Sequence, residues 1–188
     1  YYESIGTYNV NADANFHYKK HNLQLSGGRN YFDGWNPADA PFYFPQPHIA
    51  DSTRYKQWKP KEQYFANLAY QYTIKNLNLG FKSTYFTEKI INRGYPRAPY
   101  SETSFDDYYY TTRIDNSIFL NGKIAKNWTV NTLSAYNYYN RVKKTVFKDL
   151  TTLDETLSGN SSDQDTSRFT LLMSRASFIH TKDSAKLN

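Results

Sequence analysis

The stretch that decides the fold is TYNVNADANFHY, residues 7–18. Its even-numbered positions carry Tyr8, Val10, Phe16 and two alanines, whereas its odd-numbered positions carry Thr, Asn, Asp and His. Successive side chains of an extended chain point to opposite faces, so a period of two is typical of a β-strand. The stretch therefore predicts a strand with one apolar face and one polar face.

The same alternation recurs over residues 62–74, 77–88 and 108–121, and less regularly over 128–139. We expect an apolar set to point outward to lipid and a polar set on the opposite face to point to the interior. The apolar set is Tyr8, Val10, Ala12, Leu68, Tyr70, Leu79, Phe81, Ile114 and Ile118. The polar set is Asn9, Asn11, Asp13, Asn67, Gln71, Lys82, Arg113 and Asp115.

Two places depart from the alternation. Around Phe169–Met173 the pattern breaks, which predicts either a β-bulge or a strand buried on both faces. Gly27 and Gly28 lie within a predicted strand, where a glycine pair indicates a bulge or a bend.

The connections between the predicted strands alternate in length. Short turns fall at 19–22, 75–76 and 123–127, and long loops fall near 33–60, 91–107 and 148–165. All the long loops then lie at one end of the sheet, as in outer-membrane barrels. About seven strands in this order predict an all-β, antiparallel up-and-down meander over residues 1–188, forming part of a transmembrane β-barrel.

The composition agrees with such a sheet. The chain is polar on average, with a mean hydropathy of −0.81, yet 18% of its residues are aromatic, including 19 tyrosines. Tyrosine suits a surface that is apolar on its flank and wet at its ends. We expect Trp128 to lie in an aromatic girdle at the turn side of a membrane, and Tyr108 and Tyr110 in the girdle at the loop side.

No pattern of catalytic residues is found. The four histidines are isolated in sequence, and the chain has no cysteine, phosphate-binding loop or nucleophile elbow. The net charge of +6 is spread along the chain in single residues and pairs, which does not favour nucleic acid as a partner. We expect a protein that is not an enzyme, with no cofactor and no metal site.

Four stretches resemble TonB-dependent outer-membrane receptors. They are RYKQWKPKEQY (54–64), NRGYPRAPY (92–100), DYYYTTR (107–113) and YNYYNRVKKT (136–145), the last followed by KDL at 148–150. The resemblance covers most of the chain, although its motifs are diffuse. It implies a barrel of about 22 strands around an N-terminal plug domain, set in the bacterial outer membrane.

The resemblance also implies a function. Such receptors bind an extracellular siderophore, haem, cobalamin or glycan and take it up with energy from TonB. Nothing in these residues is similar to a plug domain or a TonB box, so TonB would act through a plug outside this chain. The candidate ligand-binding residues are aromatic and basic side chains of the predicted loops, which could stack on a ligand or pair with its anionic groups: Trp35, Tyr43, Phe44, Trp58, Arg93 and Arg97.

Two other functions stay open at this point. One is a small complete outer-membrane barrel with a structural or adhesive role, since about eight strands can close alone. The other is a soluble β-rich carbohydrate-binding module, which the loop aromatics would suit. We expect a segment of a larger barrel, with the first and last predicted strands at the two edges of an open sheet.

Overall fold

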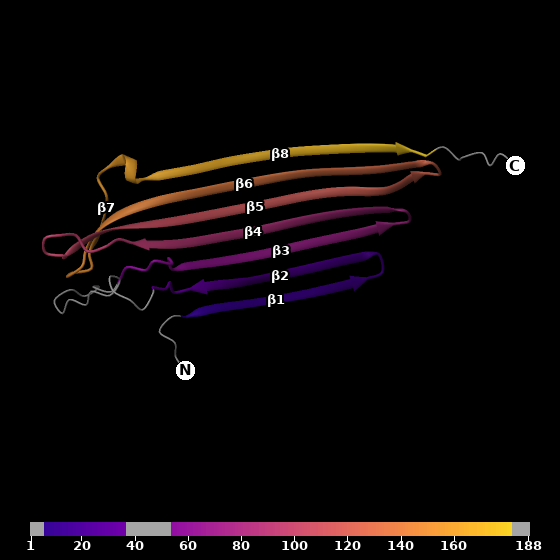
Figure 1. Cartoon of the computed structure of the whole chain (residues 1–188). Helices are drawn as coiled ribbons and strands as arrows, with labels where there is room; N and C mark the ends of the chain where they lie inside the picture. The colour runs from indigo at the N-terminus through magenta and orange to yellow at the C-terminus, as the bar shows by residue number, and fades with distance from the viewer. Residues whose placement is uncertain (1–5, 37–53, 182–188) are drawn as a thin grey trace.

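The computed structural model describes residues 6–36 and 54–181 as a single antiparallel sheet (Figure 1). Each strand follows its predecessor across the sheet in chain order, which makes an up-and-down meander. The elements are β1 (Thr7–Tyr18), β2 (His21–Phe32), β3 (Lys61–Ile74), β4 (Leu77–Arg93), β5 (Thr103–Ala125), β6 (Trp128–Asp149), β7 (Glu155–Leu157), the 3₁₀ helix η1 (Ser161–Asp163) and β8 (Asp165–His180). The predicted all-β meander is confirmed.

The sheet is open. In the described residues β1 pairs with β2 alone, and β8 pairs with β6 alone. Short β7 pairs with the far end of β6, beyond the part that β8 covers. The prediction that β1 and the strand containing Phe169 form the two edges is therefore confirmed.

The short turns lie together at one end of the sheet, here called the turn end, and the long connections lie at the other, the loop end (Figure 1). The two turns Lys19-Lys20 and Lys75-Asn76 each contain two residues. The β5–β6 turn is tighter than expected, because β5 runs to Ala125 with a register shift between Lys123 and Ala125. No sequence signal had indicated that irregularity.

The predicted long loops are partly ordered. The β4–β5 connection spans only residues 94–102, because both strands continue their ladder beyond the expected ends at 91 and 107. The connection after β6 contains β7 and η1 rather than structureless chain. Of the first long connection, residues 37–53 lie outside the described residues.

The bulges predicted at Gly27-Gly28 and near Phe169–Met173 are wrong. Gly27 and Gly28 pair without a register shift on each side. The register of β8 is also unbroken from Asp165 to His180, and almost all of its residues are exposed. The break in alternation near Phe169–Met173 is therefore neither a bulge nor a strand buried on both faces.

Candidate functional site: two unlike faces and a loop-end cluster

The register divides the side chains of the sheet between two faces. Residues directly opposite in neighbouring strands point to the same side, so the ladders can be followed from β1 to β8. Every member of the predicted apolar set then lies on one face, and every member of the predicted polar set lies on the other. The predicted segregation is confirmed, and we call the two sides the apolar face and the polar face.

The apolar face carries large side chains that are open to the surroundings. In strands β1–β6 the exposed aromatic and aliphatic residues lie almost entirely on this side; Phe105 is the exception among those described. Val10 is 67% exposed, Phe16 58% and Ile118 49%, although all three lie within regular strands. A surface of this kind has no core against which to pack.

A band without charged side chains crosses the apolar face. In β3 it runs from Tyr64 to Ile74 and in β4 from Leu77 to Thr87, a length of about 11 residues in each strand. Glu62 and Lys89 are opposite each other at its loop-end limit, and Lys75 lies at its turn-end limit. Charge is therefore excluded from the middle of this face and allowed at both ends.

Hydrogen-bonded side chains characterise the polar face. The amide of Asn67 donates to Ser26 at 3.2 Å, that of Gln63 to Glu88 at 2.6 Å, and that of Asn137 to Asp115 at 2.6 Å. Each bond joins residues on neighbouring strands. Cross-strand polar pairs of this kind stabilise a sheet whose surface is in contact with water.

Two glycines of the polar face are covered by aromatic rings. Phe65 lies opposite Gly28, and Phe119 lies opposite Gly80. A Cβ at Gly28 would come within 2.8 Å of the Phe65 ring, and one at Gly80 within 2.0 Å of the Phe119 ring. The Phe119 ring fills the space of a side chain at Gly80. At Gly28 the Phe65 ring does so together with Val10 O and the Asn11 side chain, each 2.4 Å from the same Cβ, which explains both glycines without a bulge.

The candidate ligand-binding residues fall into two pairs at the loop end. Trp35 and Trp58 form an antiparallel bridge, with reciprocal N–H···O bonds of 3.0 Å and ring centroids 4.5 Å apart. Arg93 ends β4 opposite Asp106, and Arg97 places its guanidinium 4.9 Å from the Phe105 ring centroid. The candidates Tyr43 and Phe44 lie outside the described residues.

A contact between the connections links these two pairs. Tyr55, near Trp58, stacks on Tyr95 of the β4–β5 connection, with ring centroids 3.9 Å apart and an interplanar angle of 14°. The ammonium group of Lys59 lies 4.1 Å from the Tyr55 centroid. Trp35 is 38% exposed and Trp58 48%, so one part of the predicted site faces solvent while another is packed.

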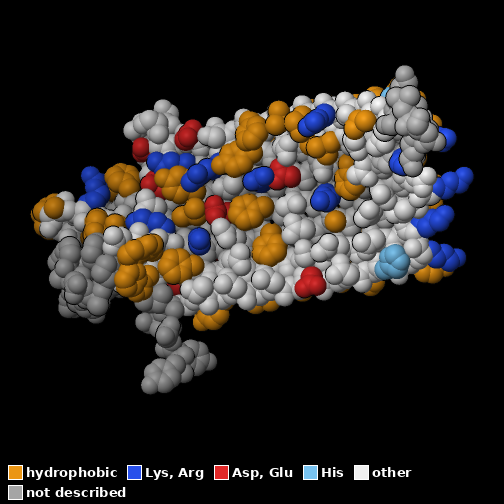
Figure 2. Space-filling view, turned by 45° about the vertical axis from the view of Figure 1, so that its right-hand side comes forward, with side chains coloured by type: hydrophobic (Ala, Val, Ile, Leu, Met, Phe, Trp, Pro, Cys, Tyr) orange, Lys and Arg blue, Asp and Glu red, His pale blue; other side chains and the backbone are white. Residues whose placement is uncertain are grey.

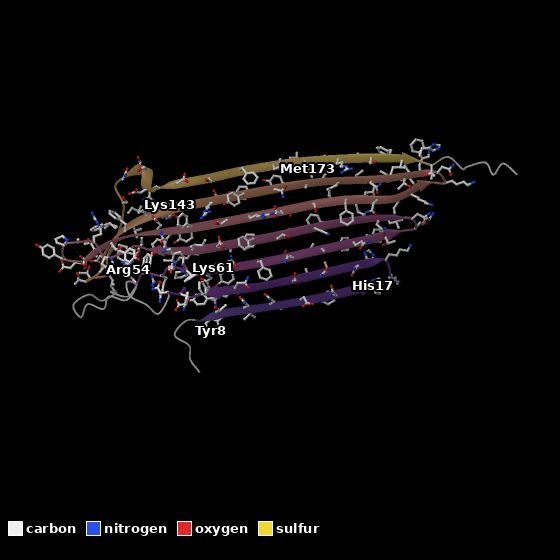
Figure 3. The ribbon with its side chains drawn as sticks, viewed as in Figure 1. Tyr8, His17, Arg54, Lys61, Lys143 and Met173 are labelled. Carbon is white, nitrogen blue, oxygen red and sulfur yellow. The ribbon has the colours of Figure 1, made fainter. Side chains whose placement is uncertain are left out.

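Next to this stack is a buried ion pair that no sequence pattern predicted. Arg54, which lies at the loop end (Figure 3), forms a salt bridge with Asp106, and both side chains are fully buried. The carboxylate also accepts a 3.2 Å bond from the Gly94 amide. Burial raises the pKa of Asp106 above its usual value, although the Arg54 guanidinium and the Gly94 amide oppose the rise. The two residues are 52 positions apart in the sequence, and no local sequence pattern predicts their contact.

A side-chain amide makes two hydrogen bonds to the backbone of β6 and so fixes the connection that follows this strand. The Gln164 amide donates to Thr145 O at 2.8 Å, and its carbonyl oxygen accepts from Thr145 N at 3.2 Å. Lys148 pairs with Glu155 at 3.0 Å, and this contact lowers the pKa of Glu155. The loop end is therefore a cluster of mutually packed connections.

Comparison with known proteins identifies no relative: no known family, curated protein or solved structure matches this chain. Within residues 6–36 and 54–181, no helix is long and apolar enough to cross a membrane, and acidic, histidine and cysteine side chains form no group that could hold a metal ion.

Proposed function

We propose that this sheet is a section of the wall of an outer-membrane β-barrel that takes up an extracellular ligand, in the manner of TonB-dependent receptors. The apolar face contacts lipid, and the polar face lines the interior. One observation carries the proposal: an exposed band without charge on one face is backed by hydrogen-bonded polar side chains on the other.

The length of the band agrees with the thickness of a membrane. About 11 extended residues span about 36 Å, and a tilt of about 45° reduces this to a height of about 25 Å. The outward apolar band of a membrane barrel has this height and is flanked by aromatic girdles. Trp128 at the turn end and Tyr110 toward the loop end, both on the apolar face, are suited to those girdles.

The other two functions have weaker support. A soluble module would expose an apolar surface across six strands, whereas soluble monomers rarely expose more than a few hundred Å² of contiguous apolar surface. A small complete barrel would need pairing between β1 and β8, and the sheet described here is open. An open edge cannot face hydrocarbon, because its backbone N–H and C=O groups lack partners. Further strands therefore complete the wall, from the same protein or from another copy.

The loop end supports the uptake part of the proposal. Packed connections hold Trp35 and Trp58 partly exposed beside a hairpin that carries Arg93 and Arg97. Aromatic rings with nearby guanidinium groups suit a flat or anionic ligand. We expect alanine substitution of the six candidate residues to reduce uptake of whichever probe the protein transports among haem, cobalamin, a ferric siderophore and an oligosaccharide. Unchanged uptake would remove these residues from the ligand site.

Neighbouring residues of β5 test the lipid assignment. The chain has no cysteine, so Ile118→Cys and Ser117→Cys each provide a single site for an environment-sensitive fluorophore on opposite faces. In the full chain reconstituted into phosphatidylcholine vesicles, lipids with a quencher on the acyl chain should quench the label at 118 and spare that at 117. Quenching at 117 alone would reverse the two faces. Quenching at neither site would favour the soluble module.

A further inference from the structure

The turn end carries positive charge that the fold does not require. Lys19 and Lys20 form the first turn, Lys75 begins the second, and Lys123 lies near the end of β5, just before the third; all four are exposed. Among the described residues of the three turns and the adjoining strand ends, none is acidic. Figure 2 shows basic side chains projecting from this end. We call these four residues the lysine rim.

The loop end shows the opposite arrangement, which makes the rim distinctive. There several basic side chains form ion pairs with acidic neighbours, as in the pairs Arg29–Glu62, Arg54–Asp106 and Lys148–Glu155. Acidic and basic side chains are therefore intermixed at the loop end, whereas the turns and strand ends that carry the lysine rim contain no acidic residue among those described.

Turn geometry does not explain the lysines. Lys19 has φ 52° and Lys75 has φ 49°, in the left-handed region that glycine and asparagine occupy most readily. Each is the first residue of a two-residue turn. A lysine at such a position is conformationally unfavourable, and the same unfavourable choice occurs in two turns. Its charge is the property that glycine and asparagine could not supply.

The turns hold the lysines in a fixed row. Thr73 N donates to Lys20 O at 2.9 Å, and Lys123 N donates to Asn76 O at 3.0 Å, so each turn is bonded to a neighbouring turn or strand end. Between the second and third turns is a hollow of about 570 Å³, lined by Lys75, Lys123 and Lys126 together with Ile74 and Ile124. Cationic heads therefore lie directly beside exposed apolar side chains, 43% exposed at Ile74 and 52% at Ile124.

We propose that the lysine rim binds the phosphate groups of anionic lipids in the membrane leaflet at the turn end. The assignment rests on the proposed function, in which the apolar band lies in the hydrocarbon and ends at Lys75. The rim is then at headgroup depth, where lysine stems lie along apolar surface and their ammonium groups reach phosphate. Ile74 and Ile124 contact the upper part of the acyl chains.

Vesicle binding by the full chain tests the assignment. Binding to phosphatidylcholine vesicles reports on the apolar face, and the additional affinity for vesicles that contain phosphatidylglycerol reports on the rim. The test variant is Lys19→Asn/Lys75→Asn/Lys123→Gln, whose asparagines suit the left-handed positions and keep the turns folded. The control is Lys56→Gln/Lys61→Gln/Lys82→Gln, which removes the same charge away from the turn end.

Each lysine near an anionic surface contributes roughly a fivefold gain in affinity, so the test variant should lose roughly a hundredfold of the phosphatidylglycerol-dependent gain. The control should keep most of it, and neither variant should alter binding to phosphatidylcholine. Equal losses in the two variants, or no loss in the test variant, would overturn the proposal.

Two further outcomes distinguish this proposal from the one on which it rests. In the first, the chain does not bind phosphatidylcholine vesicles but gains affinity from phosphatidylglycerol, and only the test variant loses that gain. This result would reject the barrel-wall proposal and keep the lysine rim as a surface that binds anionic lipid. No preference for phosphatidylglycerol, with binding of soluble polyglutamate through the rim, would assign it to an acidic protein and overturn the lipid assignment.

Discussion

The buried pair of Arg54 and Asp106 should decide whether the first long connection stays attached to the sheet. Asp106→Ala removes the carboxylate and leaves the guanidinium in a site where both side chains have no exposure. Removing one partner of a buried ion pair typically costs about 3–5 kcal/mol, because the remaining buried charge loses that compensation. The substitution also removes the acceptor of the Gly94 amide. We expect the connection to open locally while the ladders of the sheet remain.

Amide hydrogen exchange measures this opening directly. The Trp58 amide donates to Trp35 O, and the Ile91 amide donates to Pro60 O, so both report on attachment of residues 54–60. A cost of about 3 kcal/mol corresponds to exchange roughly a hundredfold faster at these amides. Amides in the middle of β5 should not change. Glu62→Gln, which disrupts the exposed pair with Arg29, serves as the control and should have little effect.

The double variant Arg54→Met/Asp106→Leu separates ionic pairing from packing. Apolar residues of similar volume often replace a buried ion pair without loss of stability, so the double variant should recover most of the protection that Asp106→Ala removes. Unchanged exchange at Trp58 in Asp106→Ala would refute the reasoning. Exchange in the double variant as fast as in the single variant would show that the packing of these particular side chains, rather than charge compensation, holds the connection.

Three other predictions follow from single positions. Gly122→Ala should lower the thermal stability by about 1–3 kcal/mol, because Gly122 has φ 138° and a Cβ there would lie 1.9 Å from Asn76 O. In the same melting experiment the control Gly159→Ala should be neutral, since no atom lies within 4 Å of its Cβ position. Hydrogen bonds from the side chain of Thr151 and from neighbouring amides hold the pKa of Asp149 below its usual value, so its stabilising effect is present above about pH 4 and is lost as the pH falls through the folded pKa. The protection of the amides that donate to Asp149, measured relative to the intrinsic exchange rate at each pH, should therefore fall on acidification, and Asp149→Asn should abolish that pH dependence. Ile118→Arg should destabilise the chain in vesicles by about 2–4 kcal/mol, measured by urea unfolding, whereas Ser117→Arg on the opposite face should have a much smaller effect.

The fold could be predicted because its determinants are local. Alternation in a strand such as Thr7–Tyr18 fixes which side chains share a face, and a one-residue slip would invert them all. The turn Lys75-Asn76 was found at its observed position because the apolar period changes phase there. Chain order alone then gives the meander, since every connection at the turn end is too short for a crossover.

The loop end could be predicted only in part, because its contacts join segments far apart in the sequence. Trp35 and Trp58 were selected as loop aromatics, but nothing local indicated that they would pair with each other. Arg54 had no apolar period or motif around it, and its partner Asp106 belongs to a ladder that extends beyond the expected strand. The ring of Phe65 over Gly28 likewise depends on a cross-strand register that one strand alone does not reveal.

The break in alternation at Phe169–Met173 lies in which side chains occupy the two faces and not in the backbone pairing. The unbroken register of β8 places Leu172 on the apolar face, and Phe169, Leu171 and Met173 on the polar face. Phe169 lies opposite Tyr139 with ring centroids 5.5 Å apart, and Met173 lies opposite Ala135, so the polar face becomes apolar toward this edge. A bulge would have restored one apolar face at the cost of ladder bonds. Around Phe169–Met173, β8 keeps its ladder and carries apolar side chains on both faces, unlike β1, whose polar face carries asparagine, aspartate and histidine. The two edges of the open sheet are therefore not chemically equivalent, because the edge at β8 carries apolar side chains on both faces around Phe169–Met173.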